Sequence, residues 1–249
     1  MTQKTNISSR AGKFTSSGIW QLMTNDRKGT GIGARGLTYI DVKRREKKLG
    51  RQIHQEKSFK SAAWGTMMQH RVLNFLITST EYKPVSDKRF EHPVLPLSGS
   101  PDFICEDRIG DIKCFELDNF TFTYDMATAG YEKLKEECPD IFWQLVSNAI
   151  LCEKEKSELI LYVPYTEELK LIRDENEWSN FLTPEQFEDK NFKWWINSLS
   201  FMEDSELPYL IPNTYYKNLS TFLFTIKKED IDILTNRIIL AVSLLNTKL

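Results

Sequence analysis

The stretch Ser100-Pro101-Asp102-Phe103-Ile104-Cys105 is followed by the turn Glu106-Asp107-Arg108 and then by Gly110-Asp111-Ile112-Lys113-Cys114-Phe115. Two short apolar runs on either side of polar turn residues predict a β-hairpin, with strands over residues 99–105 and 110–115. Residues two apart on a strand leave the same face, so Asp111 and Lys113 lie together while Ile112 points into the core. Asp102, on the preceding strand, faces them across the hairpin.

This predicted cluster of two carboxylates and one lysine suits metal-assisted hydrolysis of a phosphodiester. Carboxylates hold Mg²⁺ near the scissile phosphate, and we expect Mn²⁺ to substitute for it. A lysine orients or activates the attacking water and offsets the charge that develops on the phosphate. The same residues also fit an exposed hairpin with alternating charges, and the hairpin alone does not decide between the two interpretations.

The rest of the chain predicts an α/β core around this hairpin. Apolar residues at helical spacing, with capping signals, predict helices over residues 16–24, 37–49, 61–78, 139–152 and 229–245. Apolar runs predict strands over residues 158–163 and 221–226. The weaker pattern of residues 166–213 predicts an insertion or lid of short helices, whose tryptophans we expect in the core or at a subunit contact rather than stacked on bases.

The length of 249 residues fits one domain. We expect a single domain over 1–249, with a motif-bearing core at 8–165 and a final strand and helix at 214–249. No run reaches the roughly 18 apolar residues of a membrane span, and the polar start lacks the apolar core of a signal peptide. We therefore expect a cytoplasmic protein with no membrane partner.

The net charge of −2 hides a strong asymmetry. Residues 1–60 carry 14 Lys/Arg and 4 Asp/Glu, a balance of +10, and the remainder carries 19 Lys/Arg and 31 Asp/Glu, a balance of −12. This split predicts one surface that meets phosphates and another that does not. A basic, solvated helix with no partner is the alternative. The four cysteines suit neither a common zinc module nor an iron–sulfur cluster, so we expect reduced and mostly buried thiols.

Three further segments flank the hairpin in order. RAGKFTSS occupies residues 10–17, KSAAWGTMMQ occupies residues 60–69, and Gln144 lies in the predicted helix over 139–152. Together with the hairpin, which supplies S-P-D and D-x-K-C, these segments resemble the phage lambda exonuclease and YqaJ-like branch of the PD-(D/E)XK nucleases. The resemblance covers roughly residues 8–165 and implies a restriction-endonuclease-like core, a central mixed sheet flanked by helices, with a C-terminal helical insertion.

The resemblance implies a role for each matching residue. Asp102, Asp111 and the backbone carbonyl of Ile112 would bind Mg²⁺, and Lys113 would be the catalytic lysine. Contacts to the 5′-terminal phosphate, or to the attacking water, would come from Arg10, Ser17, Lys60, Ser100 and Gln144. A guanidinium grips a phosphate at two oxygens and a hydroxyl donates to a third, so these residue types are chemically suitable.

Gln69 departs from the family pattern, which places a glutamate at this position of the helix. A glutamine keeps the carbonyl oxygen but loses the charge and does not act as a base. Three interpretations follow: the Gln69 amide binds the metal or a water, a nearby acid such as Glu91 supplies the charge, or activity is weak or lost. We expect activity to be retained, with Gln69 in the catalytic group.

The function implied by the resemblance is a Mg²⁺-dependent 5′→3′ exonuclease on linear double-stranded DNA, in recombination or phage DNA processing. Its partners would be DNA ends, a single-strand annealing protein and further copies of the chain, in a trimer. Two alternatives remain at this point. One is an endonuclease or resolvase of the same superfamily, and the other is a catalytically weakened DNA-end-binding protein, which Gln69 suggests.

Overall fold

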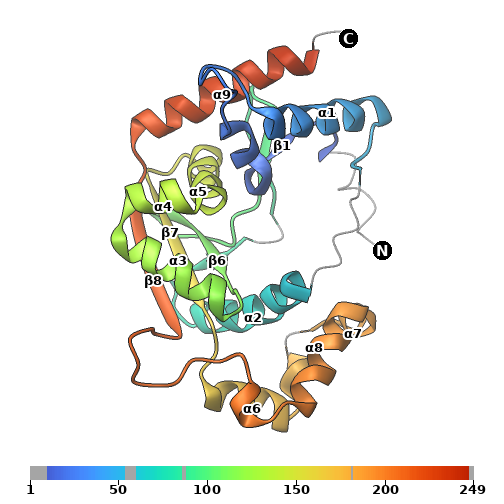
Figure 1. The fold of residues 1–249 in the computed structure, drawn as a ribbon, viewed down its shortest axis with the longest axis vertical. Coiled ribbons are helices and arrows are strands. Elements are labelled where there is room, and N and C mark those ends of the chain that lie inside the picture. Colours follow the sequence, from blue (N-terminus) through green and yellow to red (C-terminus); the bar gives the residue numbers. More distant parts are fainter. Residues whose placement is uncertain (1–9, 54–59, 86–87, 181, 247–249) are drawn as a thin grey trace.

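A five-stranded mixed sheet lies at the centre of the molecule, with helices on both of its faces, which confirms the predicted α/β class (Figure 1). The computed structural model describes residues 10–53, 60–85, 88–180 and 182–246. In spatial order the strands are β2 (Lys83–Pro84), β5 (Phe103–Ile104), β6 (Arg108–Lys113), β7 (Lys156–Tyr162) and β8 (Leu219–Thr225). Strands β6 and β7 are parallel, and the other neighbouring pairs are antiparallel.

The predicted hairpin is present as β5 and β6. Phe103 pairs with Gly110 and Ile104 with Ile109. Asp102 lies directly before β5, and its backbone amide donates to the carbonyl of Gly110 at 3.0 Å. The prediction of one strand from Gly99 to Cys105 is wrong, because the chain changes sheets in the middle of this segment. Pro101 has no N–H to continue a ladder of hydrogen bonds, so the strand is interrupted there.

The residues before Pro101 belong to a second, smaller sheet that the sequence did not predict. Its strands lie in the order β1 (Phe14–Thr15), β4 (Leu97–Gly99) and β3 (Phe90–Glu91). Strands β1 and β4 are parallel, with Thr15 opposite Ser98. The N-terminal segment and the S-P-D segment therefore run side by side, although more than 80 residues separate them.

Helices cover both faces of the large sheet. One face packs against α5 (Pro139–Cys152), and the other packs against α2 (Lys60–Leu76), on which α8 (Lys190–Phe201) packs in turn. The alternation on β7 shows this directly, since Leu159 and Leu161 belong to the core beside α5 whereas Ile160 belongs to the core beside α2. All three side chains are fully buried, as expected for a strand covered on both faces.

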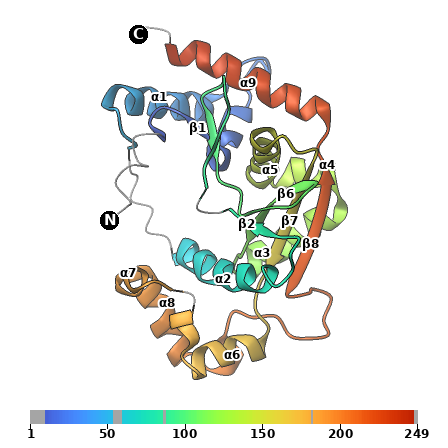
Figure 2. The same ribbon diagram turned by 180° about the vertical axis from the view of Figure 1, so that it is seen from behind.

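Further helices extend the two layers. The 3-10 helix η2 (Ser16–Met23) and α9 (Lys228–Asn246) pack on α5, and α1 (Ala34–Leu49) packs on both of them. Residues 166–213 form α6, η3, α7, α8 and η4, which lie at the opposite end of the molecule from α1 and α9 (Figure 2). The bounds not yet given are α6 (Thr166–Asp174), η3 (Glu177–Asn180), α7 (Pro184–Glu188) and η4 (Asp204–Glu206).

Two helices, α3 (Leu117–Ala129) and α4 (Tyr131–Glu137), were not predicted. The α3 sequence is rich in threonine and aromatic residues, which have weak helix propensity. Tertiary packing outweighs that propensity, because Phe120, Thr123 and Ala127 are buried. Gly130, at φ 106°, ends α3 in a conformation that favours glycine and allows α4 to start directly afterwards.

The other predicted elements are confirmed within a few residues at each end. The cysteines of the described part are free thiols and mostly buried, as expected. Trp178 and Trp195 lie in the core, which confirms that part of the expectation, whereas the Trp194 side chain is 37% exposed. No described helix combines the length and the apolar character that crossing a membrane would require.

Candidate active site

The carboxylate of Asp102 is held by the hairpin and by α2. Its Oδ2 accepts a hydrogen bond from the backbone amide of Ile112 at 2.7 Å, and its Oδ1 accepts one from Gln69 Nε2 at 2.5 Å. Gln69 therefore reaches the predicted catalytic group, and it does so through its amide nitrogen. The backbone amide of Ile112 makes this contact, while a metal-binding role for the Ile112 carbonyl stays a prediction.

Asp111 and Lys113 leave the same face of β6, as predicted, and meet Gln144 from α5. Gln144 Nε2 donates to Asp111 Oδ1 at 2.6 Å, and Lys113 Nζ donates to Gln144 Oε1 at 3.0 Å. Lys113 Nζ also lies 2.6 Å from Asp111 Oδ2 in an ion pair. A glutamine 31 residues away in the sequence thus bonds to both residues of the pair.

Burial and like charge shape the electrostatics of this group. Burial first, and then the negative charge of Asp111, raises the pKa of Asp102 to about 7. Burial opposes the positive charge of Lys113, but the carboxylates of Asp111 and Asp102 outweigh it and hold the pKa of Lys113 above its usual value. The ammonium is therefore charged at neutral pH, and Asp102 is easily protonated there.

The Trp64-Gly65 pair positions α2 against β6. Trp64 is fully buried, and its indole Nε1 donates to the backbone carbonyl of Phe115 at 3.0 Å, just beyond the end of β6. A Cβ atom on Gly65 would lie 3.5 Å from the carbonyl oxygen of Cys114, so the helix runs close to the strand at this point. These contacts of Trp64 and Gly65 fix the distance between α2 and β6, and so the position of Gln69 relative to Asp102.

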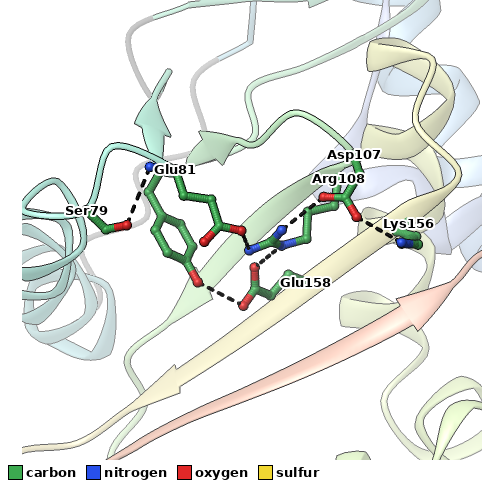
Figure 3. Close-up of polar contacts among 7 residues, drawn as sticks. Ser79, Glu81, Asp107, Arg108, Lys156 and Glu158 are labelled. Atoms are coloured by element: carbon green, nitrogen blue, oxygen red, sulfur yellow. Dashed lines mark hydrogen bonds and ion pairs between the residues drawn. The ribbon is translucent and has the colours of Figure 1, made fainter.

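A charged cluster holds the other end of the hairpin (Figure 3). Arg108 contacts Glu158 at 2.6 Å, Glu81 at 2.5 Å and Asp107 at 2.9 Å. Burial opposes the charge of Arg108, but these three carboxylates hold its pKa above its usual value. Lys156 Nζ adds an ion pair to Asp107 at 2.8 Å. The turn is thereby tied to β7 and to the segment after α2, which fixes the hairpin that carries the two aspartates.

Beside Gln144 lies a cavity of about 210 Å³, at the ends of the parallel strands β1 and β4. Its lining residues are Arg10, Thr15, Ser16, Ser17, Ser98, Gly99, Ser100 and Gln144. Four of the five residues predicted to contact phosphate, Arg10, Ser17, Ser100 and Gln144, therefore share one cavity. Arg10 Nη2 donates to Ser100 Oγ at 3.4 Å.

The loop that carries Arg10 is held by a buried ion pair on α1. Lys43 Nζ and Glu46 Oε2 are 3.0 Å apart and their side chains are 6% and 3% exposed. The same Glu46 oxygen accepts a hydrogen bond from the backbone amide of Gly12 at 3.2 Å. Gly12 has a φ of 73°, and a Cβ atom there would lie 2.8 Å from Lys47 Cβ, so only glycine fits this turn.

Two predicted residues lie apart from this group. Lys60, at the start of α2, places its Nζ 3.5 Å from the centre of the Trp194 ring, and it does not line the cavity. Glu91, on β3, forms ion pairs with Lys13 at 2.5 Å and with Arg89 at 2.8 Å. The phosphate contact of Lys60 stays a prediction, and so does the role of Glu91 as the acid that supplies negative charge to the metal site.

The residues present fit a magnesium ion. Mg²⁺ prefers oxygen ligands and binds through one or two carboxylates, with water and substrate phosphate completing its shell. Asp102 and Asp111 offer two carboxylates that repel each other, as the raised pKa of Asp102 indicates. Across the part of the chain that the structure describes, no group of three acidic, histidine or cysteine side chains is placed to hold a metal.

The fold is similar to those of solved exonucleases. The alkaline exonuclease LHK-Exo from Laribacter hongkongensis matches with a TM-score of 0.60 and 14% identity, over 96% of this chain and 90% of that one. Its complex with dAMP gives a TM-score of 0.61 over the same shares of the two chains, also at 14% identity. A phage-related exonuclease from Haemophilus somnus 129PT gives 0.58 at 16% identity, over 94% and 93% of the chains. This chain has their fold.

At these identities the similarity establishes the fold alone. No protein-family model matches the chain, and no curated protein matches it by sequence. The exonuclease fold agrees with the architecture that the five ordered motifs predicted. Residues that the sequence did not single out are the cavity residues Ser98 and Gly99 and the supporting residue Glu46. For Ser98 and Gly99 the only signal in the sequence was that they directly precede Ser100, and Glu46 had no such signal.

Proposed function

We propose that this chain is a Mg²⁺-dependent 5′→3′ exonuclease that degrades the 5′-phosphorylated strand of linear double-stranded DNA. One observation carries the proposal: Gln144 lines the cavity beside Arg10 and also bonds to Asp111 and Lys113. A single side chain thus joins a site suited to a terminal phosphate to a site suited to phosphodiester hydrolysis. This arrangement supports cleavage next to a bound 5′ end.

Each residue has a distinct task in the proposed reaction. Arg10 grips the terminal phosphate through its guanidinium, and Ser17 and Ser100 donate hydroxyl hydrogen bonds to it. Lys113 orients the attacking water and offsets the negative charge that builds up on the scissile phosphate. Asp111 and Gln144 hold the ammonium of Lys113 in place.

Asp102, Asp111 and the carbonyl of Ile112 are the residues that would hold Mg²⁺. When bound, the ion would lower the pKa of its water and polarise the phosphoryl oxygens. Gln69 contributes an amide that hydrogen-bonds to Asp102 and does not supply a third negative charge. We infer that the ion relies on its waters and the DNA phosphate for the remaining ligands.

The biological setting is part of the same proposal. Removal of the 5′ strand leaves a 3′ overhang, which is the substrate of a single-strand annealing protein in recombination or phage DNA processing. We propose that several copies of the chain assemble around the DNA, with a trimer as the expected form. A trimer that encloses the duplex would stay on one strand through many cycles of cleavage.

A digestion assay tests the proposal. We expect the protein with Mg²⁺ to release mononucleotides from a linear duplex bearing 5′ phosphates, to act more slowly on 5′-hydroxyl ends, and to leave covalently closed circles intact. EDTA should stop the reaction. Lys113→Ala should lower the rate by about 10²–10⁴-fold. Arg10→Ala should remove the preference for the 5′ phosphate, and Arg173→Ala on α6 is the matched control, which should keep both properties.

Two outcomes would redirect the proposal. Cleavage of closed circles would indicate an endonuclease or resolvase. Binding of linear ends without cleavage in Mg²⁺ or Mn²⁺ would indicate a DNA-end-binding protein. Of these two alternatives, Gln69 favours the DNA-end-binding protein over the endonuclease. Its amide donates to Asp102 at the position where the family pattern has a glutamate, so a carboxylate is missing beside the residues proposed to bind the metal.

A further inference from the structure

A second and larger cavity adjoins the phosphate cavity on the side away from the catalytic group. Its volume is about 730 Å³, and it shares Arg10, Thr15 and Ser17 with the smaller cavity. From these residues it extends along η2 and α1 as far as Lys43 and Glu46. A phosphate bound at Arg10 would therefore have open space beyond it.

The charge of this second cavity is positive. Arg10 and Arg35 both line it, and neither forms an ion pair with a carboxylate in the described part of the chain. Among its described lining residues one is acidic, Glu46, which is paired with Lys43 at 3.0 Å. Among the described residues, two arginines thus line the space without an ion-pair partner, although Arg35 also lines a neighbouring cavity that contains Glu132 and Glu136. Guanidinium groups bind phosphate oxygens well.

The remaining lining favours phosphate over a nucleobase. Unpaired bases bind to proteins largely by stacking on aromatic rings. Arg35 lies over the Trp20 ring at 4.8 Å from its centre, and Lys43 lies 5.3 Å from the centre of the Tyr39 ring. Each of the two aromatic rings among the described lining residues thus has a cation over one face. The other polar side chains, Gln21, Thr38 and Gln52, are suited to hydrogen bonds with phosphate oxygens.

We propose that the second cavity binds the additional phosphates of a 5′-polyphosphorylated strand end. The α-phosphate would lie in the small cavity with Arg10, Ser17 and Ser100, and the β- and γ-phosphates would lie in the large cavity near Arg35. This inference rests on the proposed function, since it requires the small cavity to hold the terminal phosphate. It widens the substrate class from monophosphate ends to triphosphate ends.

Equilibrium binding tests the inference without any cleavage step. Blunt duplexes with a 5′ hydroxyl, a 5′ monophosphate or a 5′ triphosphate would be titrated with the full-length protein in EDTA, with fluorescence anisotropy as the measurement. We expect the triphosphate end to bind at least as tightly as the monophosphate end. Arg35→Gln should lower the ratio of triphosphate to monophosphate affinity by about tenfold, the loss typical of one hydrogen-bonded contact to a charged group.

Arg45→Gln is the matched control, because Arg45 lies on the same helix, is exposed and pairs with Asp41 outside both cavities. It should leave the ratio unchanged. If monophosphate ends bind better than hydroxyl ends but triphosphate ends bind more weakly, the inference is wrong while the proposed function stands. If the ratio is the same in the wild type and in Arg35→Gln, the inference is also wrong. Equal binding of hydroxyl and monophosphate ends would overturn both.

Discussion

At the scale of single residues, the contact between Gln69 and Asp102 sets the character of the candidate active site. Asp102 is buried and close to Asp111, so its negative charge is costly at neutral pH. The amide of Gln69 donates a hydrogen bond to this carboxylate, which reduces that cost. A glutamate in the same place would add a third negative charge. Compared with a glutamate at position 69, we therefore expect glutamine to make the metal-free protein more stable and to lower its affinity for the metal.

A prediction follows for Gln69→Glu. In metal-free buffer at neutral pH the variant should lose about 1–3 kcal/mol of stability, because a hydrogen bond is replaced by repulsion between carboxylates. For a chain of this length that is roughly 2–10 °C in Tm. Adding Mg²⁺ should raise the Tm of the variant more than that of the wild type, since the extra carboxylate strengthens metal binding to the folded state. Thermal unfolding with and without MgCl₂ measures both effects.

Gln186→Glu serves as its control. Gln186 is the third residue of a capping box on α7, where glutamate serves equally well. Its Tm should stay close to that of the wild type, and its response to Mg²⁺ should not change. The same response to Mg²⁺ in Gln69→Glu and the wild type would show that residue 69 does not face a metal.

At the scale of elements, the packing of α2 against β6 decides whether Gln69 of this helix can reach Asp102. Trp64 precedes Gln69 by five residues on α2, and its indole donates a hydrogen bond to the backbone carbonyl of Phe115, just after β6. Its ring also packs at 4.8 Å from that of Trp195 on α8. The W-G pair in the motif is thus a structural anchor, while the group proposed to act in the site is Gln69.

Trp64→Phe tests this anchor. The change leaves the half-buried carbonyl of Phe115 without its donor and opens a small cavity in place of the buried indole, so we expect a loss of about 2–4 kcal/mol. Trp194→Phe is the comparison, because Trp194 is 37% exposed and should lose less than about 1 kcal/mol. Urea denaturation of the two variants measures the difference. Equal losses would show that the indole bond does not hold α2.

At the scale of the whole molecule, charge is separated along the longest axis. The basic N-terminal part includes α1, which lies at one end beside α9, and the segment 166–213 lies at the other (Figure 1). That segment has eleven acidic and four basic residues, a balance of −7. Some of the basic residues on α1 do not face solvent, in contrast to the alternative interpretation of this segment as a basic, solvated helix. Lys43 is buried with Glu46, and Arg44 donates to the Leu244 carbonyl near the end of α9 at 2.7 Å.

The separation predicts a salt-dependent interaction with DNA. Binding at the basic end releases counterions, so the dissociation constant for linear duplex should rise steeply between about 50 and 200 mM KCl. Anisotropy titrations at several salt concentrations measure the slope, and sucrose at equal osmolality is the control. A dissociation constant that is independent of salt would contradict the prediction.

Several elements could be predicted from the sequence because their signals are local. The hairpin over residues 103–113, the helix Pro139–Cys152 and the strand Leu219–Thr225 follow from periodicity, turn residues and a proline at the first helical position. The segment Leu117–Glu137 could not be predicted, because its helices are stabilised by burial of Phe120 and Leu134 in the core and not by their own propensity. The second sheet was missed because its short strands carry too few residues for a pattern.

The sequence by itself determined which chemical groups this protein has: two aspartates and a lysine in the hairpin segment, and an arginine, two serines and a glutamine as candidate phosphate contacts. Only the tertiary structure decided that Gln144 joins the two sets, since this contact depends on α5 packing against β6 and on β1 lying beside β4. The tertiary structure likewise left Lys60 and Glu91 apart from the site and placed Arg10 between two cavities. Contacts of this kind arise from the packing of distant segments, and packing has no signature within a single segment.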